Sequence, residues 1–231
     1  MAKPALISLF LFLMITAISQ EILAVDYSFV NDAGTTPGGT VFATQIGEDY
    51  AQEVLPKATD FIWQTFQETS DADRKPLNQV TLVLEPSLSY PAQTLNNQIQ
   101  FNAEYLAGYS GSDLKNEFTG IVYHEMTHVW QWNGNGQARG GLIEGIADFI
   151  RLKAGLAPST WGPPGSGTNW DDGYGTTARF LDYCESLMPG FVAQLNRKMR
   201  DGYSDAFFQD LLGKPVDQLW SDYKAQYGNT N

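Results

Sequence analysis

Residues 121–132 read IVYHEMTHVWQW, and this stretch decides what the rest of the fold must hold in place. On a helix, His124 and His128 are one turn apart on the same face, so their two imidazoles can converge on one metal ion. Glu125 follows the first histidine, where its carboxylate can reach a water bound to that metal. This is the H-E-x-x-H arrangement of zinc hydrolases.

The histidine count favours the metal interpretation. The chain has 2 histidines, and both lie in this motif. The alternative is a helix with two hydrogen-bonded core histidines and no metal. Two histidines scattered at random over 231 residues would rarely fall at i and i+4 around a glutamate. A catalytic zinc of this kind takes both histidines, one further protein ligand and a water.

Length and charge narrow the possible partners. A chain of 231 residues is long enough for one domain with its own core, and we expect a single catalytic domain over residues 25–231. The formal net charge of −12 argues against nucleic acid and anionic membranes as partners. We therefore expect no nucleic-acid partner. Separately, we expect a monomer.

Residues 1–24 resemble a secretory signal peptide. Lys3 supplies a positive charge, residues 5–18 are almost entirely apolar, and small residues follow. A membrane anchor is the alternative, but the run is short for a spanning helix and no second apolar run follows it. We expect cleavage after Ser19 or Ala24, secretion to the extracellular space, and no membrane contact afterwards.

The chain has one cysteine, Cys184, so it cannot form an internal disulfide. We expect Cys184 to be a small buried apolar side chain on a helix, with a reactive thiol as the alternative. Stability must then come from core packing and from bound metal.

The apolar pattern predicts strands first and helices afterwards. The predicted strands are residues 26–30, 79–84 and 98–101, the last as an exposed edge strand, with a turn at residues 35–39. The predicted helices are residues 47–67, 112–132 and 142–154, with more helix from residue 176 on. This order indicates an α+β fold: a small N-terminal sheet, the helix of the metal site and a mostly helical C-terminal half.

The third metal ligand is expected on the helix after the motif. Glu144 and Asp148 are one turn apart there, and their neighbours are apolar. Glu144 could instead complement the helix dipole, but polar groups that face a core need a partner. We favour Glu144 as the ligand and Asp148 as the acceptor of a histidine hydrogen bond. The reverse assignment is the alternative.

A hydrolase also needs a donor that stabilises the oxyanion. Neither histidine is free for this role, so we name Tyr174 and Arg179 as candidates; the alternative for Tyr174 is an ordinary packed aromatic. An extended peptide could pair with the expected edge strand, residues 98–101. Trp170, on the long loop of residues 158–172, is expected to line the cleft.

Three motifs carry a family resemblance. They are HEMTHVWQWNG at 124–134, GGLIEGIAD at 140–148 and LKAG at 152–155, and they resemble the plant basic secretory protein family. Weaker matches at 25–27, 61–63, 170–174, 177–184 and 191–199 extend the resemblance over nearly all of the chain after the signal peptide. The chain departs from the family's basic character, because its pI is ≈ 4.4.

The resemblance implies a secreted, zincin-like metallopeptidase of the gluzincin type, associated in plants with defence and located in the apoplast or cell wall. It implies His124, His128 and Glu144 as zinc ligands, Asp148 as the acid behind them, and a peptide or protein substrate. The rival hypothesis is a secreted defence protein that binds a wall glycan or a protein partner and has a structural or vestigial zinc. Glu125 favours the enzyme, because a structural site needs no base. A zinc hydrolase of another substrate class would share all these residues.

Overall fold

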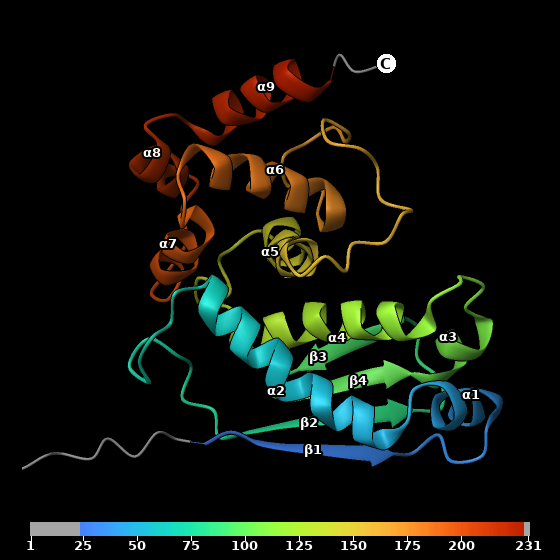
Figure 1. Cartoon of the computed structure of the whole chain (residues 1–231). Helices are drawn as coiled ribbons and strands as arrows, with labels where there is room; N and C mark the ends of the chain where they lie inside the picture. Colours follow the sequence, from blue (N-terminus) through green and yellow to red (C-terminus); the bar gives the residue numbers. More distant parts are fainter. Residues whose placement is uncertain (1–23, 229–231) are drawn as a thin grey trace, which may run out of the picture.

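The fold is a small mixed β-sheet followed by a mostly helical C-terminal half (Figure 1). The computed structural model describes residues 24–228. The strands are β1 (Asp26–Asn31), β2 (Gln79–Glu85), β3 (Ala92–Leu95) and β4 (Gln98–Asn102). The helices of the first half are α1 (Pro37–Gln45), α2 (Glu48–Thr65), α3 (Ala103–Gly108) and α4 (Leu114–Trp130). Those of the second half are α5 (Gly140–Lys153), α6 (Tyr174–Leu187), α7 (Phe191–Lys198), α8 (Ala206–Leu212) and α9 (Val216–Tyr227). The α+β class expected from the sequence is confirmed.

The sheet has the strand order β1-β2-β4-β3. Strands β1, β2 and β4 are parallel, and β3 runs antiparallel to β4. Leu82 and Leu84 of β2 are fully buried, and Leu84 pairs in register with Phe101 of β4. On the opposite face, the hydroxyls of Ser28 and Thr81 hydrogen-bond at 2.9 Å. The period-2 pattern therefore directs one apolar face to the helices.

The edge of the sheet differs from the expectation. Residues 98–101 were expected at an exposed edge, but β4 lies between β2 and β3, and the edge strands are β1 and β3. A tight turn joins β3 to β4, and in it Asn96 has a φ of 58°, a conformation that asparagine tolerates. Strand β3 is short and half polar, so its sequence carries only a weak strand signal.

The turn expected at residues 35–39 is partly the start of helix α1. Pro37 occupies the first turn of this helix, and the hydroxyl of Thr36 accepts a hydrogen bond from the backbone N–H of Gly39 at 3.1 Å. A Cβ at Gly38 would lie 1.9 Å from the carbonyl oxygen of Ala103. Glycine is therefore needed for close packing here, although Pro-Gly-Gly reads as a turn.

Helix α4 packs one face on the sheet and leaves the histidine face for α5. The ring of Phe118 lies 4.9 Å from that of Phe101, and the indole of Trp130 donates to the hydroxyl of Thr59 on α2 at 3.1 Å. The helix begins after Asp113, whose carboxylate accepts from the N–H of Asn116. It thus starts two residues later and ends two residues earlier than predicted.

An aromatic cluster forms the core of the C-terminal half. Trp170 is 5% exposed and its ring lies 5.3 Å from that of Phe208, so the expectation that it lines the cleft is wrong. Cys184 on α6 is free and fully buried, as the sequence indicates, and burial raises the pKa of its thiol. Its burial makes it an apolar packing residue.

Two further expectations concern membranes. The expected signal peptide, apart from its last residue Ala24, lies outside the described residues, and so does the cleavage point after Ser19. Among residues 24–228, no helix combines the length and the apolar character needed to cross a bilayer.

The packing of α5 on α6 gives the first prediction. A Cβ at Gly145 would lie 2.2 Å from Cγ2 of Thr177, so Gly145→Ala should lower the free energy of unfolding by about 1–3 kcal/mol. Gly140 lies on the same helix, and a methyl group added there would meet nothing within 4 Å, so Gly140→Ala is the matched control. Urea denaturation of both variants tests this, and equal unfolding free energies would contradict the packing argument.

Candidate metal centre

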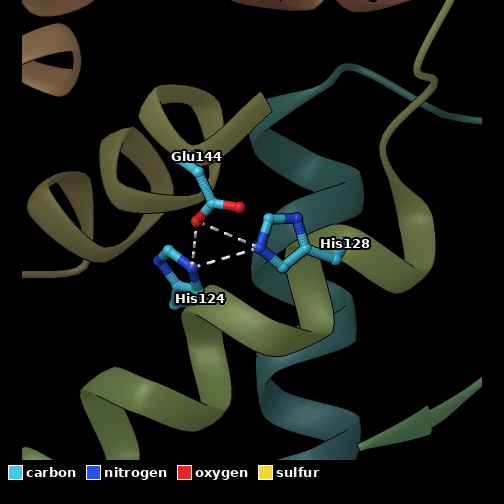
Figure 2. A group of neighbouring side chains, drawn as sticks. All are labelled: His124, His128 and Glu144. Atoms are coloured by element: carbon cyan, nitrogen blue, oxygen red, sulfur yellow. Dashed lines mark hydrogen bonds and ion pairs between the residues drawn. The ribbon is translucent and has the colours of Figure 1, made fainter. Parts of the chain in front are cut away.

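Two histidines of α4 and one glutamate of α5 meet at a single point (Figure 2). The Nε2 atoms of His124 and His128 lie 3.1 Å apart. Oε2 of Glu144 lies 3.1 Å from Nε2 of His124 and 3.6 Å from Nε2 of His128. One possible ligand atom from each of these residues lies within 4.8 Å of the others. The structure thus brings together the three residues that the sequence proposes as ligands.

Each histidine is also held through its other ring nitrogen. Oδ1 of Asp148 lies 2.6 Å from Nδ1 of His124, and the amide nitrogen of Gln131 lies 2.7 Å from Nδ1 of His128. With both Nδ1 atoms engaged, both Nε2 atoms face the meeting point. Such partners fix the orientation and the tautomer of a metal-ligating histidine.

The amide of Gln131 bears on the tautomer of His128. Its Oε1 atom is buried without a hydrogen-bond partner among residues 24–228. A flip of this amide would let Oε1 accept a hydrogen bond from Nδ1–H of His128, with loss of the 3.3 Å hydrogen bond that Nε2 of Gln131 donates to the carbonyl oxygen of Ile143. The Nε2 lone pair of His128 would then be free to bind a cation.

The donor set fits a zinc ion. Two imidazole nitrogens and one carboxylate oxygen are the protein ligands of many catalytic zinc sites, whose remaining position is left for water. The side chain of Glu144 is 31% exposed, and the hydrogen bond and ion pairs that it makes within the described part of the chain are with the two histidines. A cation at the meeting point would satisfy the carboxylate and both nitrogens together.

Without a metal, a proton takes the place of that cation. Burial lowers the pKa of His124, but hydrogen bonds to Asp148 and Glu144 outweigh burial and raise it to about 10. Burial raises the pKa of Glu144, and the hydrogen bonds from His124 and His128 more than reverse this, so the pKa lies well below its usual range. In the metal-free protein, protonated His124 and ionised Glu144 therefore form an ion pair. A metal that binds both side chains must displace the proton from His124.

Glu125 is tied to the edge strand. The hydroxyl of Thr94 on β3 lies 2.7 Å from Oε2 of Glu125 and 3.0 Å from its backbone oxygen. The hydroxyl can donate to the carboxylate and so restricts its rotamers. The carboxylate borders the same cavity as the two histidines.

A cavity of about 620 Å³ opens over the metal centre. Strand β3 borders it on one side and α4 and α5 on the other, with Tyr90 and Tyr174 among the lining residues. These two tyrosines are 63% and 59% exposed. The loop before α6 contributes Trp161 to the wall, in place of the expected Trp170.

Tyr174 lies over the metal centre in a strained conformation. Its ring is parallel to that of His124, with ring centroids 6.0 Å apart and an angle of 10° between the planes. Its φ is 44°, a left-handed value that costs a bulky residue about 1–2 kcal/mol. Such strain is common at functional positions. Arg179, the other candidate donor, is not among the described residues that border the cavity.

Comparison with known proteins identifies the family of the chain. A family model named BSP and described as "Peptidase of plants and bacteria" matches residues 22–223. The chain belongs to the BSP family. In addition, 59 residues are 49% identical to a protein of Boswellia serrata named "Basic secretory protease", a match that covers 26% of this chain and 67% of that protein. The family resemblance drawn from the motifs is thus confirmed.

Several side chains of this BSP-family site are absent from the sequence prediction. Gln131 lies three residues after His128, a helical spacing that could have indicated it. Arg151 lies three residues after Asp148 and carries the same signal. Thr94 reaches the site only because β3 pairs with β4, and local sequence gives no sign of that.

Zinc affinity should rise with pH between about 6 and 8, by up to about tenfold per unit for one displaced proton. The reason is that His124 keeps its proton below its raised pKa of about 10 in the metal-free protein. Competition with a chelating dye of known affinity measures the effect. His128→Ala is the control that should not bind zinc tightly at any pH. An affinity that stays constant over this range would contradict ligation by imidazole.

Proposed function

We propose that this member of the BSP family is a zinc-dependent metallopeptidase of the gluzincin type, with His124, His128 and Glu144 as zinc ligands. The observation that carries the proposal is the convergence of three donor atoms from α4 and α5 within 4.8 Å of one another, beside Glu125 in one cavity. When bound, zinc lowers the pKa of a coordinated water and polarises the scissile carbonyl.

Glu125 is the general base in this proposal. Its Oε2 atom is held by Thr94, and its Oε1 atom makes no hydrogen bond within residues 24–228. Oε1 can therefore take a proton from the attacking water and deliver it to the leaving amine. Asp148 acts indirectly, because it accepts a hydrogen bond from Nδ1–H of His124 and keeps the Nε2 lone pair directed at the meeting point.

Tyr174 is the proposed donor to the oxyanion. Burial raises the pKa of its hydroxyl, and the charges of Glu144, Asp148 and Glu125 raise it further. The hydroxyl therefore keeps its proton at neutral pH and can donate it in a hydrogen bond as charge develops on the carbonyl oxygen. The strained backbone at this position supports a functional role.

The proposed substrate is an extended peptide or a protein segment that pairs with β3. This strand is an edge of the sheet, and Ala92, Gln93 and Thr94 border the cavity. Its free backbone N–H and C=O groups can hydrogen-bond to a peptide backbone. From the sequence, peptide pairing was expected at residues 98–101. These residues lie inside the sheet, so we assign peptide pairing to β3 instead.

Secretion and a role in plant defence are also part of the proposal. They rest on the signal-like residues 1–24, on the family resemblance, and on the word "secretory" in the name of the Boswellia serrata relative. We propose the apoplast or cell wall as the location and a monomer as the active form. The alternative is a binding protein with a structural or vestigial zinc. Glu125, which borders the cavity beside the proposed ligands, favours the peptidase because a binding protein needs no general base.

Glu125→Gln should reduce peptide hydrolysis by at least about a hundredfold, because the amide cannot act as a general base. Zinc content and fold should be unchanged, since Glu125 is not a proposed ligand. The assay is digestion of a peptide library, read by mass spectrometry, with zinc measured by atomic absorption. Glu53→Gln, an exposed change on α2, is the matched control that should retain full activity.

The same assay separates the two function classes. Equal hydrolysis by the parent protein and Glu125→Gln would indicate a contaminating protease. No hydrolysis by the parent protein across the library, with zinc bound, would favour the binding protein. Only a loss confined to the Glu125 variant supports the peptidase.

Tyr174→Phe should lower kcat by about 10²–10³-fold with little change in KM, because one oxyanion donor is lost. Tyr174→Gly should lose the same activity yet unfold no more easily, since glycine accepts the φ of 44° without strain. Peptidase kinetics and thermal unfolding test both variants. Tyr183→Phe, on the same helix and packed against Tyr223, is the control. Full activity in Tyr174→Phe would remove Tyr174 from the mechanism.

A further inference from the structure

Two cations border the cavity, on opposite sides of the metal centre along α4. Lys75 donates to the carbonyl oxygen of Val129, near the end of the helix, at 2.9 Å. Arg151 lies beside Gly120, near the start of the helix. A Cβ added to Gly120 would lie 2.5 Å from Nε of Arg151. Burial lowers the pKa of Lys75 to about 8, so Arg151 is the more permanent charge.

Arg151 is held rigidly but keeps one nitrogen free. Its Nε donates to the carbonyl oxygen of Leu156 at 3.0 Å, and its Nη2 donates to Oε2 of Glu117 at 2.8 Å. Its Nη1 makes no hydrogen bond within the described part of the chain, although the side chain is only 8% exposed. Nη1 is not one of the fully buried polar atoms that lack a partner in the described residues, and Arg151 borders the cavity. The free N–H groups are therefore available to a ligand in the cavity.

The surroundings of Arg151 strengthen an interaction there. Trp161 lies over the guanidinium at 5.9 Å and is itself packed on Gly175, where a Cβ would meet the indole at 2.6 Å. Ile121 of α4 also borders this part of the cavity. Apolar walls of this kind exclude water and strengthen charge-assisted hydrogen bonds.

The direction of β3 determines which end of a bound peptide lies near Arg151. Asn102, at the end of β4, hydrogen-bonds to the carbonyl oxygens of Tyr90 and Pro91 just before β3. Helix α4 also begins at this end of the sheet, beside α3 (Figure 1). A peptide that pairs antiparallel with β3 therefore has its C-terminal part at the start of α4, where Arg151 lies.

Helix geometry gives the spacing along the cleft. Arg151 lies beside Gly120, which is one turn before His124 on α4. This corresponds to about 6 Å along the axis of α4, the helix that Thr94 of β3 contacts. An extended peptide advances about 3.3 Å per residue. Arg151 is thus within reach of the first two or three residues after the scissile bond.

We infer that Arg151 forms a subsite for a peptide carboxylate on the C-terminal side of the scissile bond. The ligand is either the carboxylate of the chain terminus or the side chain of an aspartate or glutamate. The inference rests on the proposed peptidase function and specifies its substrate. Planar guanidinium groups bind carboxylates in this way, with Nη1 and the second hydrogen of Nη2 as available donors.

The test compares four acetylated peptides of one sequence, acetyl-Ala-Ala-Phe-X. X is Ala with a free carboxylate, Ala amide, Asp amide or Asn amide. Binding to the zinc-loaded Glu125→Gln protein is measured by calorimetry, which needs no turnover. We expect at least about tenfold tighter binding of the carboxylate member in one or both pairs. The pair that shows the preference identifies the source of the carboxylate.

The variants assign the preference to Arg151. The double variant Glu117→Gln with Arg151→Gln removes both charges of the ion pair and avoids an unpaired buried acid; it should bind both members of each pair within about twofold. Arg151→Lys should keep part of the preference. Lys153→Gln on the same helix, whose side chain is 42% exposed, should keep all of it. Circular dichroism checks that each variant is folded.

Two results would overturn the subsite. One is the absence of any carboxylate preference in the Glu125→Gln protein that carries Arg151. The other is a preference that survives in the folded double variant and disappears when zinc is removed, which would assign carboxylate binding to the metal. The outcome for the peptidase is separate. If the parent protein shows no measurable hydrolysis but the carboxylate preference still depends on Arg151, the subsite is supported and the peptidase is not.

Discussion

The site depends on the contacts that His124 makes with two carboxylates of α5. Nδ1 lies 2.6 Å from Asp148 and Nε2 lies 3.1 Å from Glu144. Both acids project from α5 among buried apolar side chains, and burying them without a partner would be costly. The imidazole of His124 therefore acts as a polar link between α4 and α5, and the position of α5 fixes the geometry of the metal centre.

Two further acids, one beside the cavity and one on its wall, each have a donor from another element. Glu117 on α4 pairs with Arg151 on α5 at 2.8 Å, and Glu125 on α4 is held by Thr94 on β3. Loss of any one donor would leave a carboxylate in a poorly solvated place. The polar network thus ties the edge strand and both helices together, so that side chains are oriented before a substrate arrives. The same network explains how an acidic chain can place Glu125, Glu144 and Asp148 on one cavity.

The sequence predicts the metal centre better than its surroundings. The i, i+4 spacing of His124 and His128 and the acids one turn apart on the next helix follow from helix geometry alone, and the structure brings these residues together. Strand β3 and its contact to Glu125 depend on long-range pairing that local patterns do not encode. Trp170 was misplaced because loop composition says nothing about which aromatic side chain points inward; Trp161 borders the cavity and Trp170 joins the core.

The shortness of β3 limits what can be recognised. The strand has 4 residues, a length of about 13 Å at 3.3 Å per residue. A peptide paired with it gains few backbone hydrogen bonds, and such bonds do not distinguish one sequence from another. A short exposed edge also offers little to a second copy of the chain, which protects this edge of the sheet from edge-to-edge association. In the proposed peptidase, selectivity must therefore come from side-chain pockets, and a folded protein could enter the cleft only where it offers a locally extended segment.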